Sequence, residues 1–167
     1  MPRTRQAKLA TLDVVEEIAR RVPGYRGYQE AAQRREDDRR FRSSIAEHLR
    51  MEARRLERIE SRQFREDLSD FLEEVDGGAQ RLEFLADSIV IPCTSPGNHH
   101  PGEDCTDPVG RLDHQIVETL DRLHRVVHEL EKAYAHDQQF QMNLTELRSV
   151  CERIADLIEH RNIAIAR

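Results

Sequence analysis

The sequence contains no tryptophan, and aromatic residues amount to five phenylalanines and three tyrosines. Charged residues make up 35% of the chain, whereas glycines and prolines gather in a few short clusters. This composition favours long amphipathic helices over sheet. The length suits a single domain over residues 1–167, with a flexible N-terminus over residues 1–10.

Long apolar runs are also absent. No stretch approaches the roughly 18 apolar residues that a membrane-spanning helix needs. The N-terminus, MPRTRQAKLATLD, lacks the apolar core of a secretory signal. We therefore expect a cytoplasmic protein whose three cysteines are reduced.

Charge is unevenly distributed along the chain. Residues 1–62 hold 16 basic against 11 acidic residues, and residues 63–167 hold 10 against 21. The basic residues are nearly all arginine, since Lys8 and Lys132 are the only lysines. Acids are interleaved throughout the basic half, which favours basic helices packing beside acidic ones, within the molecule or across a dimer. Contact with phosphate or an anionic membrane is the alternative.

Helix patterns begin with the segment TLDVVEEIARRV, which Pro23-Gly24 ends. From Tyr28 to Asp76 there is neither glycine nor proline, so this segment would form one long helix if it is continuous. Its apolar stripe loses phase between Ile59 and Phe64, which places a kink or break near Ser61. Gly77-Gly78 is expected to end this helix as a C-cap, before a shorter helix that runs to Pro92.

The C-terminal half carries two seams with coiled-coil spacing of three and four residues. A turn is predicted around residues 136–143 between them, with Asn143 and Glu146 capping the last helix. The product is an all-α antiparallel bundle of four to five helices, with coiled-coil-like seams and one long helix. The seams are Leu112, Ile116, Leu120, Leu123, Val127, Leu130 and Tyr134, then Phe140, Leu144, Leu147, Cys151, Ile154 and Ile158.

The stretch PGYRGY predicts a tight chain reversal. Pro23 fixes φ, Gly24 permits a type II turn, and Gly27 adds a second flexible point. Tyr25 and Tyr28 are expected to pack over the corner with their hydroxyls toward water. A recognition site for a protein partner is the functional alternative for this motif.

The segment from Arg21 to Arg50 resembles a family of uncharacterised bacterial all-helical proteins, in which a PGYxGY turn precedes an arginine-rich helix. The resemblance covers residues 12–50 and is topological beyond them. It implies an all-helical fold and no known activity. The matching residues are Pro23, Gly24, Tyr25, Gly27, Tyr28, Arg34, Arg35, Asp38 and Arg50.

A long Pro/Gly/Cys/His loop over residues 92–110 interrupts the helices. Cys93, His99, His100 and Cys105 supply ligand types that zinc prefers, but they lack the C-x2-C knuckle of classical zinc sites. A disulfide between the two cysteines and an ordinary connector are the other interpretations. Cys151 lies on an apolar stripe, where a buried thiol is expected.

Two further clusters have both a functional and a structural interpretation. His124 and His128 share a helix face, and His48 could complete a metal triad, although surface histidines beside acids are simpler. The arginine-rich helix offers phosphate contacts, but its i,i+4 acid–arginine pairs favour a solvated face. Those arginines are Arg34, Arg35, Arg39, Arg40 and Arg42.

No nucleophile elbow or phosphate-cradling glycine loop is present in the sequence. The leading hypothesis is a non-enzymatic helical interaction or assembly protein, with a protein partner or homo-oligomer and no cofactor. The alternatives are a zinc-binding or redox-responsive bundle that uses the Cys93–Cys105 loop, and a small nucleic-acid-binding helical subunit.

Overall fold

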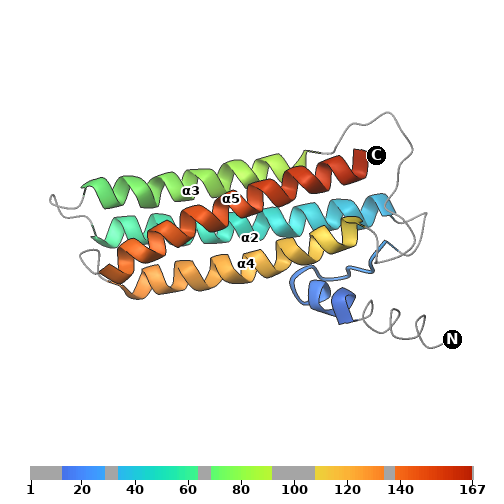
Figure 1. Ribbon diagram of the computed structural model, residues 1–167, viewed down its shortest axis with the longest axis horizontal. Coiled ribbons are helices and arrows are strands. Elements are labelled where there is room, and N and C mark those ends of the chain that lie inside the picture. Colours follow the sequence, from blue (N-terminus) through green and yellow to red (C-terminus); the bar gives the residue numbers. More distant parts are fainter. Residues whose placement is uncertain (1–12, 29–33, 64–68, 92–107, 134–137, 167) are drawn as a thin grey trace.

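The computed structural model describes residues 13–28, 34–63, 69–91, 108–133 and 138–166. These residues form five helices and no strand, so the all-α bundle is confirmed (Figure 1). None of these helices is apolar over a stretch long enough to cross a membrane. The helices are residues 13–21, α2 (Arg34–Gln63), α3 (Ser69–Val90), α4 (Pro108–Lys132) and α5 (Gln138–Ala166).

The four long helices stand at the corners of a square. α2 packs mainly against α3, and α4 mainly against α5, while α2–α4 and α3–α5 close the other two sides more loosely. Figure 1 shows that the two close pairs are antiparallel, and that α3 and α5 run in the same direction. α3 and α4 therefore lie diagonally opposite, which explains why a short turn does not join them.

The core follows the predicted stripes closely. The α5 seam from Phe140 to Ile158 is buried at every predicted position, because spacing of three and four residues keeps one helix face inward. The α4 seam is buried from Ile116 to Leu130, and Leu112 is half-buried. Residues 13–21 add Ile18, and Val22 follows just beyond them, both fully buried.

The segment from Tyr28 to Asp76, whose continuity the sequence left open, is not one helix. α2 ends at Gln63, close to the expected break near Ser61, and α3 starts at Ser69 and packs antiparallel against α2. Gly77-Gly78 does not end a helix, because α3 continues through both residues to Val90. The local glycine signal is overridden by packing: a Cβ on Gly78 would lie 2.9 Å from a Leu147 methyl carbon.

The predicted start of the last helix is also wrong. α5 begins at Gln138, so Asn143 lies inside the helix rather than at its N-cap. Its side chain is 5% exposed and accepts a hydrogen bond from Gln139 at 3.0 Å. Glu146 pairs across the surface with Arg122 instead of capping α5.

Candidate functional site

The PGYRGY segment forms the predicted tight turn. Gly24 has φ +80° after Pro23, and the Tyr25 amide donates to the Val22 carbonyl at 3.0 Å, as a type II turn requires. A second reversal follows, with φ +70° at Gly27 and +60° at Tyr28. The left-handed backbone of a tyrosine is costly, so strong side-chain contacts must hold it in place.

Those contacts correct the expected orientation of the two tyrosines. Tyr25 and Tyr28 are 5% and 2% exposed, and their hydroxyls point into the bundle rather than toward water. Both donate to the same carboxylate oxygen of Asp113, at 3.1 and 2.6 Å. Side chains this deeply buried are not accessible as a recognition site, so the turn serves to close one end of the bundle.

Asp113 and Arg161 form the centre of this cluster, and each is 0% exposed. Arg161 Nε donates to Asp113 Oδ1 at 2.5 Å, and Nη2 donates to the Tyr28 hydroxyl at 2.7 Å. Arg161 Nη1 lies 2.8 Å from Asp38 Oδ1, an ion pair without hydrogen-bond alignment. The guanidinium also lies over the Phe41 ring, 4.6 Å from its centroid. We call Tyr25, Tyr28, Asp38, Asp113 and Arg161 the polar cluster.

Burial and charge set the protonation of the polar cluster. Burial raises the pKa of Asp113 above its ordinary value, and Arg161 with the two tyrosine hydroxyls acts against this. Burial likewise raises the pKa of both tyrosines, so their hydroxyls keep the protons that they donate. For Arg161, burial alone would lower the pKa, but Asp113, Tyr28 and Asp38 raise it above the ordinary value. The guanidinium is therefore charged and held by two carboxylates.

The arginine-rich segment is not one open basic face. Arg42 is 2% exposed and donates to Asp38, its predicted i,i+4 partner, at 2.9 Å and to the Ile89 carbonyl at 2.9 Å, so its side chain is not accessible to a phosphate. Arg40 donates to the Gly24 carbonyl, and Arg39 lies 3.4 Å from Glu36. Arg35 is exposed, and the side chain of Arg34 lies outside the described residues.

His124 and His128 of α4 lie in an ion-pair network with α2. Arg55 forms a bidentate pair with Glu131, at 3.0 and 2.7 Å, and contacts Glu52 at 2.6 Å. His124 Nδ1 lies 2.8 Å from Glu52 and 2.9 Å from Arg55. Arg55 thus supplies the cation among these acids, and within the described ranges no group of three ligand side chains could hold a metal.

Residues 92–107 of the Cys/His loop, including Cys93, His99, His100 and Cys105, lie outside the described residues. The predicted loop extends to residue 110, but α4 already begins at Pro108. The zinc, disulfide and connector interpretations therefore stay predictions. Cys151 is buried, as expected, and burial raises the pKa of its thiol to about 11. A thiol in this environment is unreactive at neutral pH.

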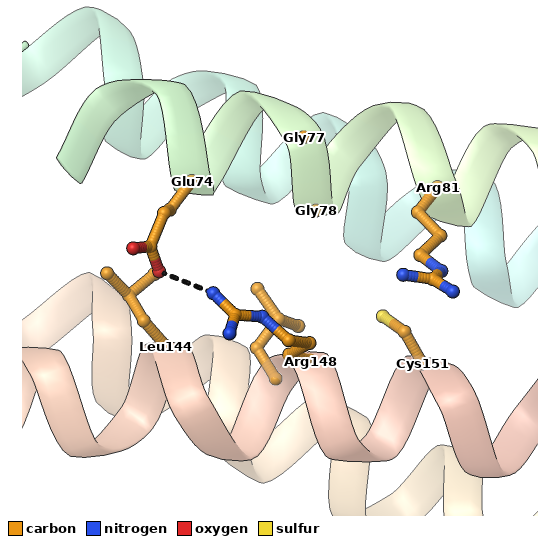
Figure 2. Close-up of a pocket in the computed structure, with 8 residues that line it drawn as sticks. Glu74, Gly77, Gly78, Arg81, Leu144, Arg148 and Cys151 are labelled. Atoms are coloured by element: carbon orange, nitrogen blue, oxygen red, sulfur yellow. Dashed lines mark hydrogen bonds and ion pairs between the residues drawn. The ribbon is translucent and has the colours of Figure 1, made fainter. Parts of the chain in front are cut away.

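An open groove runs along the loosely packed side between α3 and α5. Figure 2 shows Glu74 of α3 paired with Arg148 of α5, and Arg81 opposite Cys151. The space has a volume of about 240 Å³, and Gly77 and Gly78 are among the residues that line it. A Cβ on Gly77 would meet nothing within 4 Å.

Farther along the same side, Phe84 lies 69% exposed beside a second opening of about 410 Å³. Ile91 and Ile163, 66% and 42% exposed, extend this apolar surface. We call the outward residues of the two helices the α3–α5 face, and the second opening the Phe84 hollow. The hollow is lined by Phe84, Leu85, Ser88, Ala155, Ile158, Glu159, Asn162 and Ile163.

The sequence analysis predicted neither the polar cluster nor the α3–α5 face, although each left a signal in the sequence. Arg161 continues the spacing of the last seam, three residues after Ile158, so a buried position was indicated. The outward row of α3 repeats at Gly77, Arg81, Phe84, Ser88 and Ile91, a second seam-like spacing on the solvent side. Comparison with models of protein families, with curated proteins and with solved structures found no match.

Proposed function

We propose that the protein is a non-enzymatic helical interaction module that binds another protein through its α3–α5 face. The exposure of Phe84 supports this most directly. Burying an exposed phenylalanine in an interface lowers the free energy, because its apolar surface is removed from water. Aromatic residues that fill pockets dominate the binding energy of many interfaces. Phe84 is not isolated: Ile91 and Ile163 are also exposed on this face, and a contiguous apolar patch marks an interaction site where a single exposed residue does not.

The chemistry of the other clusters supports binding more than catalysis. The centre of the polar cluster is closed to solvent, since Asp113 and Arg161 are both 0% exposed. The Arg55 network satisfies its own charges, with Arg55 bound to Glu52 and Glu131. Both arrangements stabilise the packing of helices and leave the α3–α5 face as the surface suited to a partner.

Site-specific photo-crosslinking in cells that make the protein tests this proposal. A photo-reactive phenylalanine analogue at position 84 should give discrete higher-mass products, because it would lie inside the interface. The same analogue at Arg54, an exposed residue of α2, is the matched control and should give none. Ile163→Glu, which places a charge beside the Phe84 hollow, should abolish the products. Equal labelling from positions 84 and 54, or none from 84, would refute the proposal.

A further inference from the structure

We propose that the α3–α5 face binds a second copy of this chain, through a two-fold axis parallel to the bundle. This inference rests on the proposed function and names the partner. Two features of one molecule carry it: a protruding Phe84 lies beside a hollow on the same face, and exposed Arg81 of α3 and exposed Glu152 of α5 carry opposite charges. Self-complementary surfaces of this kind are what a two-fold interface requires.

The geometry follows from which residues of α3 and α5 lie at the same height along the bundle axis. We call such residues residues of equal level. α3 and α5 run in the same direction, and residues about 70 positions apart lie side by side (Figures 1 and 2). Gly78 lies against Leu147, and Arg81 lies opposite Cys151. A two-fold axis parallel to both helices keeps each residue at its level and exchanges the helices. α3 of one copy therefore lies over α5 of the other, with residues of equal level in contact.

The residues that meet in this arrangement are chemically matched. A cation meets an anion, an aromatic ring meets the hollow, and an aliphatic side chain meets another. Each contact occurs twice because the interface is symmetric. The three pairs, α3 of one copy first and α5 of the other second, are Arg81 with Glu152, Phe84 with Ala155, and Ile91 with Ile163.

Charge favours this arrangement. The parallel axis brings exposed Arg81 of α3 against exposed Glu152 of α5 in the second copy, so opposite charges meet twice. Glu83 and Asp87 of α3 pair with Arg50 of α2 and are partly neutralised there.

The projected area of the face comes close to that of a specific dimer. α3 has 22 residues, so it is about 33 Å long at ~1.5 Å per residue. Two adjacent helices are about 20 Å wide, which gives roughly 660 Å² of projected surface per copy. Protruding side chains such as Phe84 add to this, and a stable interface buries about 800 Å² per partner.

Sedimentation velocity of the full chain between about 1 and 200 μM tests the proposal. The wild type should dimerise. Arg81→Glu and Glu152→Arg should each weaken self-association at least about tenfold, because each places like charges together twice. An equimolar mixture of the two variants should dimerise again, since both contacts then join opposite charges. Restored pairing between separate molecules excludes an effect confined to one molecule. Arg54→Glu, a charge reversal on exposed α2, should leave the dimer unchanged.

Three results would overturn the second copy as partner: a monomeric wild type at the highest concentration, dimers of both single variants, or no recovery in the mixture. Circular dichroism checks that the variants fold, which is expected because Arg81 and Glu152 are exposed. Failure of the proposed function can be distinguished from failure of the second copy as its partner. If position 84 crosslinks a different protein while the purified chain is monomeric, only the second copy is refuted. If position 84 crosslinks nothing, the interaction module itself is refuted.

Discussion

Replacing Asp113 by asparagine should destabilise the protein by about 3 kcal/mol. The substitution keeps the shape of the side chain but removes the charge that holds a fully buried guanidinium. Removing one member of a buried ion pair costs roughly 3–5 kcal/mol. The lower end applies because Arg161 retains Asp38, 2.8 Å away. This is a large part of the ~5–15 kcal/mol by which a domain is stable.

Urea unfolding followed by circular dichroism measures this effect. With a slope of about 2 kcal/mol/M, the midpoint should fall by ~1.5 M. Asp121→Asn is the matched control, because Asp121 also lies on α4 and pairs with an arginine, Arg21, but is half exposed. It should cost less than ~1 kcal/mol. Equal costs for the two substitutions would refute the view that burial gives the Asp113 pair its importance.

Three further predictions concern other contacts. Tyr28→Phe removes a hydroxyl that contacts Asp113 at 2.6 Å and Arg161 at 2.7 Å, so it should lower the free energy of unfolding in urea by about 2 kcal/mol. Tyr25→Phe removes one contact, with Asp113, and should lower it by ~1 kcal/mol. Gly77→Ala should raise thermal stability by about 0.5–1 kcal/mol, whereas Gly78→Ala should lower it by ~1 kcal/mol, since only the second Cβ collides; the opposite order would contradict the packing. With the loop cysteines replaced by serine, native Cys151 should resist thiol reagents at neutral pH. Its raised pKa, about 11 against 9.0, should lower stability relative to Cys151→Ala as pH rises through that interval, by up to ~3 kcal/mol.

Periodicity predicted the elements whose burial depends on their own sequence. α4 and α5 have regular seams, and a helix that buries such a seam needs no information from elsewhere in the chain. The same reasoning failed at Gly77-Gly78. Glycine favours a helix end locally, but here two helices approach closely, and Leu56 and Leu147 occupy the space where a Gly78 side chain would be.

The orientation of the tyrosines failed for a related reason. Beside glycines in a turn, a tyrosine hydroxyl is expected at the surface, where water accepts its hydrogen bond. Its acceptor, Asp113, lies 85 residues beyond Tyr28, and the guanidinium that completes the contact lies 133 residues away. Pairings at such separation depend on the tertiary arrangement of the helices, which local patterns do not contain.

The polar cluster and the α3–α5 face are connected through α5. Arg161 points into the bundle and Ile163, two residues later, points out, as helix geometry requires. An apolar seam alone tolerates small rotations of a helix about its axis, whereas the directed contacts of Arg161 with Asp113, Tyr28 and Asp38 fix one rotation. That rotation sets the direction of Glu152 and Ile163 on the outer side. Asp113→Asn should therefore weaken both folding and self-association, whereas Arg81→Glu should weaken self-association alone. Loss of stability in the second variant, or an unchanged dimer in the first, would show that the two features act independently.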